Sequence, residues 1–340
     1  MQKFRILLAA AAALLVSWVA AQATTLDDVK ARGNVICGIA VGAPGFVFPD
    51  NNGVYHGFDV DFCHAIGAAV LGDAKKVQTI PLEPRDVFPK LTTGAVDVLT
   101  HRLTWTYNRD NGGGIEFAAT YFYDGQGFMV PKSLGVTRLA DLKGANICVS
   151  QGTTTELNIA DYFKSHQMPY QIVTFNGPDV AREAYNQGRC DAFSNDRSSL
   201  AANRLVLTHP DDHIVLPETI SKEPIGPWVR QGDQQWSHIV RWTLFATMAA
   251  EELGITQANV DDLRKNPDAS PEVKRILGVG DDLGQKMGLS ADWAYNVIKQ
   301  VGNYGEIFDR NIGPNTPIKL QRGQNALWKN GGLIYAPPFR

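Results

Sequence analysis

The sequence predicts an α/β protein built from two lobes, and three observations lead to this. Strand-like apolar runs alternate with helical ones in residues 35–99, and the same alternation returns in residues 146–194. An extended stretch with Gly, Pro and aromatic residues follows each set, so the chain has two places to cross between lobes. A length of 340 residues favours two domains over one. Alternation of this kind is typical of sheets with mainly parallel strands.

The N-terminus, residues 1–23, has the pattern of a cleaved secretory signal. Lys3 and Arg5 precede an apolar stretch at residues 6–21, and a small-residue pattern, Ala-Gln-Ala, closes it at residues 21–23. The apolar stretch is short for a membrane span, which needs about 20 residues. A buried structural helix is the alternative. No Cys follows the cleavage pattern, so we expect an exported protein without a lipid anchor.

The two lobes are predicted from two similar series of segments. The first series is strand 35–40, helix 58–71, strand 77–82, helix 87–91 and strand 96–99. The second is strand 146–150, helix 154–163, strand 171–175, helix 180–186 and strand 190–194. The phrases Gly-Ala-Val-Asp at 94–97 and Gly-Arg-Cys-Asp at 188–191 echo each other, each with a Gly at a helix end and an Asp within a strand. Similarly built lobes, or a chance echo, would explain them.

The chain is expected to return to the first lobe after the second. We assign the predicted parts as follows: lobe 1, residues 24–125 and 227–340; lobe 2, residues 131–220; hinge segments, residues 121–130 and 221–229. After Asp233 the sequence becomes helical, with an apolar stripe of Trp236, Val240, Leu244 and Met248 at four-residue spacing. Such a stripe indicates core packing. We therefore expect a helical C-terminal extension on lobe 1.

Export permits disulfides, so the four cysteines are informative. Cys37 lies in the first predicted strand and Cys63 in the helix that follows it. Cys148 and Cys190 lie in the corresponding part of the second series. Of the three pairings that four cysteines allow, we predict Cys37 with Cys63 and Cys148 with Cys190, one bridge per lobe. Buried free thiols are the alternative.

The clearest signal for a binding site is the helix start at residues 151–156. Thr153 and Glu156 match a capping box, which leaves the backbone N–H groups of Thr154 and Thr155 free. A carboxylate or phosphate is favoured at such a position. An ordinary capped helix solvated by water is the alternative.

Two further segments carry charge just past predicted strand ends, where ligands bind in open α/β domains. Residues 97–109 contain several threonine hydroxyls together with His101, Arg102 and Arg109. An arginine can bind a carboxylate through two parallel hydrogen bonds. Asp196 follows the last strand of the second series and could receive an ammonium group. A surface salt bridge and a turn-forming Asp are the alternatives for Arg109 and Asp196.

Composition and motifs exclude several classes of function. A pI near 6.2 without a long basic run argues against nucleic acid as a partner. The sequence has no Gly-x-Ser-x-Gly or phosphate-loop motif, and Pro210 separates His209 from His213. We therefore expect neither a metal nor a cofactor.

Several motifs in a fixed order resemble the type II periplasmic solute-binding proteins of polar amino-acid ABC transporters, and the general L-amino-acid-binding subgroup in particular. They are Gly42-Ala-Pro-Gly-Phe46, Gly57-Phe-Asp-Val-Asp-Phe-Cys63, Thr104-Trp-Thr106, Arg109-Asp110, Glu223-Pro-Ile-Gly-Pro227, Trp242-Thr-Leu244, Val301-Gly-Asn-Tyr-Gly-Glu-Ile-Phe308, Asn325-Ala-Leu-Trp328 and Tyr335-Ala-Pro-Pro-Phe-Arg340. The resemblance covers essentially the whole chain after the signal. It implies a monomeric, non-enzymatic periplasmic protein that hands an L-amino acid to a membrane permease.

The resemblance also implies a role for each site residue. Arg109 would clamp the ligand α-carboxylate with Thr104 beside it, and Thr153 and Thr154 would bind the same carboxylate from the other lobe. Asp196 would receive the α-ammonium, helped by the main-chain carbonyl of Arg102.

The ligand side chain is harder to predict, because this chain departs from its relatives at His101-Arg102-Leu103. Ala40 and Ala43 stand where smaller relatives carry acidic and aromatic residues, which argues against Lys or Arg as the ligand. We expect Glu, Asp or Gln, with His101 or Arg102 near its side chain. A periplasmic dehydratase that uses Glu156 as its acid, or a chemosensory binding protein, is the alternative.

Overall fold

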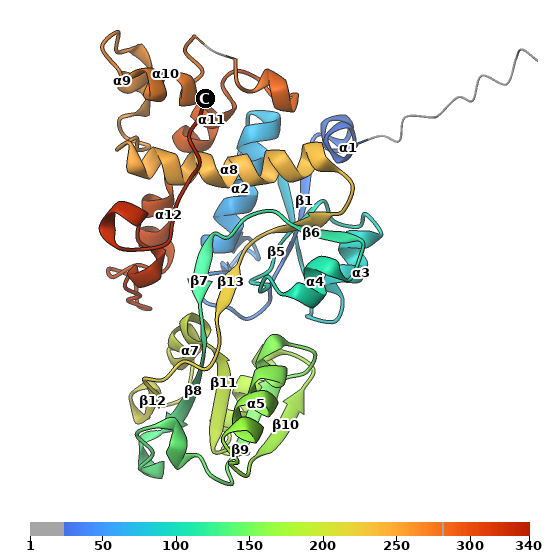
Figure 1. The fold of residues 1–340 in the computed structure, drawn as a ribbon, viewed down its shortest axis with the longest axis vertical. Coiled ribbons are helices and arrows are strands. Elements are labelled where there is room, and N and C mark those ends of the chain that lie inside the picture. The colour runs from blue at the N-terminus through green and yellow to red at the C-terminus, as the bar shows by residue number, and fades with distance from the viewer. Residues whose placement is uncertain (1–23, 281) are drawn as a thin grey trace, which may run out of the picture.

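Figure 1 shows the computed structural model, which describes residues 24–280 and 282–340. The predicted signal, residues 1–23, lies outside the described residues. Within the described part of the chain, no helix has the length and apolar character that a membrane crossing requires.

Two five-stranded sheets form the two lobes, as the sequence predicts. In lobe 1 the strand order is β4 (Val77–Pro81), β1 (Val35–Ile39), β5 (Val98–Thr100), β14 (Trp228–Arg230) and β6 (Ile115–Phe117). In lobe 2 it is β10 (Gln171–Phe175), β9 (Asn146–Ser150), β11 (Ala192–Asp196), β8 (Gln126–Pro131) and β12 (His213–Val215). Every strand and helix predicted for the two series is present, and the two-lobed α/β fold class is confirmed.

One strand in each sheet runs against the others, and it occupies the same place in both. β14 pairs antiparallel with β5 and β6, whereas β1 pairs parallel with β4 and β5. In lobe 2, β8 pairs antiparallel with β11 and β12, whereas β9 pairs parallel with β10 and β11. The reversed strand is in both cases the one that enters the sheet directly from a crossing between the lobes.

Two short strands make the crossings and lie side by side between the lobes (Figure 1). β7 (Phe122–Asp124) pairs antiparallel with β13 (Glu223–Ile225), with Tyr123 opposite Pro224. The predicted hinge segments 121–130 and 221–229 contain these strands and continue into β8 and β14, because the chain stays extended as it joins each sheet. We retain the predicted lobe boundaries as a proposal.

Helices cover both sheets. Lobe 1 contains α1 (Thr25–Arg32), α2 (Phe58–Leu71), α3 (Val87–Thr92) and α4 (Tyr107–Asn111), together with the hairpin of β2 (Phe48–Pro49) and β3 (Tyr55–His56). Lobe 2 contains α5 (Thr154–Ser165), α6 (Pro178–Asn186) and α7 (Arg197–Arg204). The C-terminal extension contains α8 (Gln234–Glu252), α9 (Val260–Lys265), α10 (Pro271–Ile276), α11 (Trp293–Gln300) and α12 (Tyr304–Asn311).

The echo between the two Asp phrases corresponds to one structural device used twice. Asp97 accepts a hydrogen bond from the backbone N–H of Ile36 at 2.7 Å, and its own N–H donates to the Ile36 carbonyl at 2.8 Å. Asp191 makes the same two bonds to Asn146, at 2.7 and 2.9 Å. Asp97 thus links the start of β5 to β1, and Asp191 links the start of β11 to β9. Each strand begins at the residue after its Asp.

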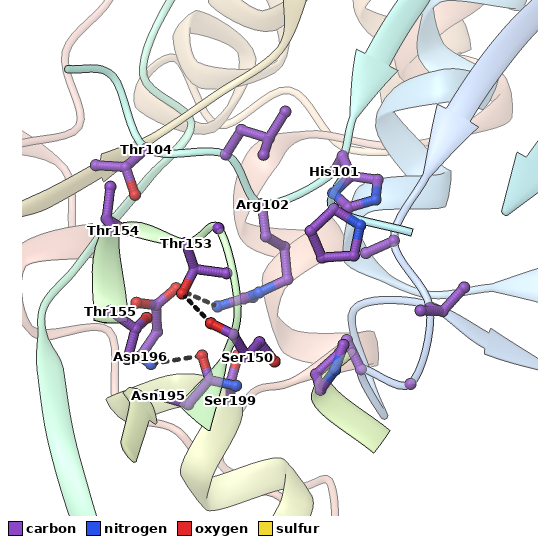
Figure 2. A pocket seen from close by; sticks show the side chains of 18 of the residues that line it. His101, Arg102, Thr104, Ser150, Thr153, Thr154, Thr155, Asn195, Asp196 and Ser199 are labelled. Atoms are coloured by element: carbon purple, nitrogen blue, oxygen red, sulfur yellow. Dashed lines mark hydrogen bonds and ion pairs between the residues drawn. The ribbon is translucent and has the colours of Figure 1, made fainter. Parts of the chain in front are cut away.

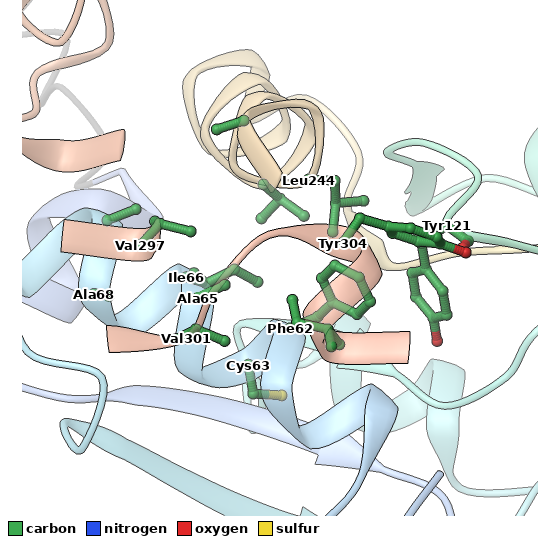
Figure 3. Packing of buried hydrophobic residues seen from close by; sticks show 14 of the residues in the cluster. Phe62, Cys63, Ala65, Ile66, Ala68, Tyr121, Leu244, Val297, Val301 and Tyr304 are labelled. Carbon is green, nitrogen blue, oxygen red and sulfur yellow. The ribbon is translucent and has the colours of Figure 1, made fainter. Parts of the chain in front are cut away.

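The C-terminal helices pack on lobe 1 and share its core. The predicted stripe of Trp236, Val240, Leu244 and Met248 is buried. Figure 3 shows Leu244 from α8 and Val297 from α11 beside the residues of α2, in one continuous cluster. The extension therefore enlarges the core of lobe 1 and leaves lobe 2 with its own, separate clusters.

Each lobe has one disulfide, and the two pairs are those that the sequence predicts. Cys37 of β1 is bonded to Cys63 of α2, with Cα atoms 6.2 Å apart. Cys148 of β9 is bonded to Cys190, which precedes β11, with Cα atoms 5.7 Å apart. Neither bridge crosses between lobes, so neither restricts a movement at the hinge.

Candidate functional site

A cavity of about 350 Å³ lies between the lobes, where strands from both sheets end. From lobe 1 its lining includes His101, Arg102, Thr104 and Arg109, which follow β5. From lobe 2 it includes Thr153, Thr154 and Asp196, at the ends of β9 and β11. The structure therefore brings all seven predicted ligand-binding residues to one cavity, and Figure 2 labels each of them except Arg109. Their roles depend on which of their polar groups are still unpaired.

Arg109 has most of its hydrogen-bonding capacity available. Its Nη1 donates to the carbonyl of Thr104 at 2.9 Å, which anchors the guanidinium to the loop after β5. A guanidinium has five N–H donors, and within the described residues this is the one side-chain hydrogen bond that Arg109 makes. Burial lowers the pKa of Arg109, and the charges of Glu223 and Asp196 raise it. A carboxylate in the cavity would find these remaining donors.

Thr104 and Thr154 use their hydroxyl hydrogens on a carboxylate of the protein itself. The buried hydroxyl of Thr104 donates to Glu223, and that of Thr154 donates to the same carboxylate at 3.4 Å. Because a hydroxyl has one hydrogen, these side chains offer only lone pairs to other groups in this arrangement. Sequence reasoning missed Glu223 as the partner of these two site residues, although it opens the Glu-Pro-Ile-Gly-Pro motif.

The start of α5 offers unpaired donors. Thr153 is its N-cap, accepting from the N–H of Glu156 at 3.3 Å and donating to the Ser150 carbonyl at 2.8 Å. The predicted capping box is only half formed, because the Glu156 carboxylate turns to the N–H of Gly152 at 2.8 Å. In residues 24–280 and 282–340, no acceptor is found for the backbone N–H groups of Thr154 and Thr155. These groups are suited to an anion.

Arg102 is already paired, within a buried cluster of charges. Its Nη2 donates to Ser198 at 2.7 Å and lies 3.4 Å from Asp124 and 3.7 Å from Asp196. The guanidinium stands over the ring of Phe46, with 3.7 Å to the centroid. Arg102 also has a φ of 54°, a left-handed conformation that is uncommon outside Gly and is often held in place at functional sites.

Asp196 is a buried carboxylate, and among the described residues its side chain has an ion-pair contact with Arg102 at 3.7 Å but accepts no hydrogen bond. Burial raises its pKa well above the ordinary value, the nearby charges of Asp124 and Glu223 raise it further, and Arg102 and Arg109 lower it. The pKa of Asp124 is also raised, mainly by burial. An ammonium group in the cavity would offset this cost by stabilising the ionised form.

His101 lines the cavity without supplying a charge to it. Its ring Nε2 is hydrogen-bonded to the Leu82 carbonyl at 2.7 Å, and burial lowers its pKa to about 4. The ring is therefore neutral near neutral pH. The rest of the lining includes uncharged polar groups from Asn195, Ser199 and Asn203, small apolar groups from Ala40 and Ala43, and one further cation, Arg85, whose side chain is 73% exposed. Within the described residues no group of three or more His, Cys, Asp or Glu is placed to hold a metal ion.

Residues 35–258 match the family model described as bacterial extracellular solute-binding proteins, family 3. The general L-amino acid-binding periplasmic protein AapJ of Rhizobium johnstonii is 54% identical over 332 residues, 97% of each chain. The glutamate/glutamine/aspartate/asparagine-binding protein BztA of Rhodobacter capsulatus is 51% identical over 94% of this chain and 95% of its own. A periplasmic binding protein of an ABC transporter from Brucella ovis, solved with glutathione bound, superposes with a TM-score of 0.91 at 50% identity, covering 94% of this chain and 100% of that one.

Proposed function

Because the chain belongs to family 3 of the bacterial extracellular solute-binding proteins, we propose that it captures an L-amino acid between its lobes and delivers it to the permease of an ABC transporter. The observation that carries this proposal is the division of unpaired groups across the cavity. Lobe 1 offers the free donors of Arg109, and lobe 2 offers the N–H groups at the start of α5 beside the carboxylate of Asp196. This set complements a zwitterion.

In the proposed complex the ligand α-carboxylate accepts hydrogen bonds from Arg109 and from the backbone N–H groups of Thr154 and Thr155. The α-ammonium donates to Asp196 and to the carbonyl of Arg102. Thr104 supports the site from behind, because its carbonyl holds Arg109 and its hydroxyl is bonded to Glu223. Thr153 shapes the helix start.

The head-group contacts come from both lobes, so full binding requires the lobes to be together. A hydrogen bond to a charged group contributes about 1.5–3 kcal/mol, and a micromolar ligand needs roughly 8 kcal/mol in total. Ordering costs reduce the sum, so several such contacts in a cavity that excludes water are needed. Ligand binding would therefore shift the population toward the closed form.

The ligand side chain would meet a mainly uncharged polar wall, with one largely exposed cation, Arg85. His101 is neutral and Arg102 is paired with two carboxylates, so neither of the residues expected near the ligand side chain offers it a free charge. The other polar groups of the lining include the amides of Asn195 and Asn203 and the hydroxyl of Ser199. The one further cation of the lining, Arg85, has a 73% exposed side chain, so solvent screens its charge. Among the expected ligands Glu, Asp and Gln, we therefore favour Gln, and with it Asn. Glutathione is a second candidate, since its γ-glutamyl end carries the same α-amino acid head group and the relative from Brucella ovis holds it.

We infer a transport role without catalysis. Glu156, the candidate acid of the dehydratase alternative, accepts a hydrogen bond from the Gly152 backbone and is not among the residues that line the cavity. Export through the signal at residues 1–23, residence in the periplasm and a monomeric state complete the proposal. Turnover of prephenate or arogenate by the purified protein would instead support the enzyme.

The decisive measurement is calorimetry on protein freed of co-purified ligand by unfolding and refolding. The panel contains Gln, Asn, Glu, Asp, Lys, Arg and glutathione, and native mass spectrometry of the untreated protein identifies any ligand carried from the cell. We expect Gln and Asn to bind most tightly among the amino acids and Lys and Arg to bind weakly. Tightest binding of Lys or Arg, or binding of none of these compounds, would overturn the proposal.

A further inference from the structure

Glu223 is a buried carboxylate that contacts both lobes and the hinge. It lies at the start of hinge strand β13 and is 2% exposed. Thr104 donates to it from lobe 1, and Thr154 and Asn158 of α5 donate to it from lobe 2, Asn158 at 2.9 Å. Ser221, two residues earlier on the crossing segment, donates as well.

These four donors are neutral, and together they surround both oxygens of the carboxylate. A buried charge is costly unless hydrogen bonds satisfy it. Hydrogen bonds to an ionised acceptor are roughly twice as strong as neutral ones, so the arrangement is a substantial link between the parts it joins. Glu223 is absent from the lining of the ligand cavity and lies behind it, toward the hinge.

The donors cannot all stay in place if the lobes separate. Thr104 moves with lobe 1, whereas Thr154 and Asn158 move with lobe 2. Opening therefore removes donors from one side of the carboxylate. We propose that Glu223 is an interlobe latch, a positioning residue that stabilises the closed form through Thr104 on one lobe and α5 on the other. The proposal rests on the proposed function only in taking closure to be the step that holds the ligand.

The latch has a signature that distinguishes it from a ligand contact. Because Glu223 acts through closure, its loss lowers the affinity for every ligand by the same factor and leaves the ratios between ligands unchanged. A residue that touched the ligand side chain would change those ratios. Loss of the latch also increases the open population of the ligand-free protein, which a local packing role would not do.

The test compares Glu223→Gln with Glu116→Gln. Glu116 is the matched control, because it is a hydrogen-bonded carboxylate whose partners, Ser237 and Arg241, lie on lobe 1 alone. Asn158→Ala removes one lobe 2 donor and serves as a second variant if Glu223→Gln does not fold. Each protein carries one spin label on each lobe, and interlobe distance distributions are recorded with and without Gln. Affinities for the ligand panel are measured in parallel.

We expect Glu223→Gln to weaken binding of all ligands by about tenfold or more, the loss of one charged hydrogen bond, and to broaden the ligand-free distances toward the open form. Asn158→Ala should also weaken binding and broaden the ligand-free interlobe distances. Glu116→Gln should have the affinities and interlobe distances of the wild type. Wild-type interlobe distances in both Glu223→Gln and Asn158→Ala, or altered ratios between ligands, would overturn the latch. If no amino acid binds the wild type, the proposed function fails, while the ligand-free distances still test the latch.

Discussion

The two lobes share one scaffold but divide the chemistry of the site between them. In both sheets the reversed strand, β14 or β8, is fourth in the sheet order. In both lobes an Asp links the start of one strand to its parallel neighbour, β5 to β1 in lobe 1 and β11 to β9 in lobe 2, and each lobe has one disulfide. Lobe 1 brings the cation of Arg109, whereas lobe 2 brings the acid of Asp196 and the start of α5. The scaffold is thus duplicated, but the site is not, and neither lobe alone complements a zwitterion.

The lobes also differ in how their cores are supported. Lobe 1 shares one large hydrophobic cluster with the C-terminal helices and has a second, smaller cluster that includes residues of α3, β5, β6 and β14. Lobe 2 has two smaller clusters, one that includes α5 residues and one around α6, and both disulfide cysteines of this lobe belong to the second. A smaller core provides less burial per lobe, so lobe 2 should depend more on its bridge.

The largest effect is therefore expected from removing the lobe 2 disulfide with Cys148→Ala and Cys190→Ala. The closed loops span 42 residues in lobe 2 and 26 in lobe 1. Loop-closure entropy gives nearly the same stabilisation for both, about 4 kcal/mol, because it grows only with the logarithm of length. We expect the lobe 2 variant to show the larger loss in calorimetric unfolding, as a separate early transition. An equal or larger loss for Cys37→Ala with Cys63→Ala would contradict the difference in cores.

The next largest effect tests the division of the site. Arg109→Ala should lower affinity for the amino acid by roughly 100-fold, since it removes about 3 kcal/mol from two charge-assisted hydrogen bonds. Thermal unfolding should change little, because α4 is short and has no buried residue. Calorimetric titration with Gln measures the affinity.

Two variants make the Arg109 result specific. Arg85→Ala removes another cation that lines the cavity but has a 73% exposed side chain, and it should bind Gln almost as the wild type does. Arg109→Lys keeps the positive charge but lacks the planar guanidinium with its paired donors. Its affinity for Gln should therefore lie between those of the wild type and Arg109→Ala. Wild-type affinity in Arg109→Ala would remove this residue from the site.

The fold could be predicted because its signals are local. Apolar periodicity identified α2 and the stripe of α8, and the paired Gly-to-Asp phrases identified the repeated scaffold. The bounds of β9 and β10 match the predicted residues. The reversed strands were not predictable in this way, because strand direction depends on how the chain re-enters a sheet after a crossing.

The location of the site could be predicted, but the state of its side chains could not. Position after a strand end brought His101, Arg102 and Thr104 to the cavity, and no sequence signal reports what each polar atom then pairs with. Arg102 is paired by Asp124 and Ser198, which are distant in sequence, and Thr104 by Glu223 across the hinge. Such pairing is a tertiary property, and it decides which groups remain for a ligand.

The smallest effect is the pH dependence of binding, and it arises in lobe 2. The pKa of Asp196 is raised above 3.8 in the ligand-free protein. Burial is the largest cause, and the negative charges of Asp124 and Glu223 add to it. Only the ionised form can accept the ligand ammonium, so binding must release the proton from whatever fraction is protonated. Affinity should therefore fall as pH is lowered through this raised pKa, by at most about tenfold per pH unit.

The variant Asp196→Asn shows how much of the pH dependence of binding comes from the titration of Asp196 itself. The variant should bind Gln more weakly than the wild type at high pH and lose the dependence, because an amide does not titrate. Since Asp124 lies close and its pKa is also raised, the wild-type curve reports the pair, and Asp124→Asn should move its midpoint to lower pH by removing one like charge. Gln is the right probe, because its side chain adds no ionisable group. An affinity that stays constant down to the ordinary value of 3.8 would show that Asp196 does not receive the ammonium, and the acid side of the site would then have to be sought elsewhere on lobe 2.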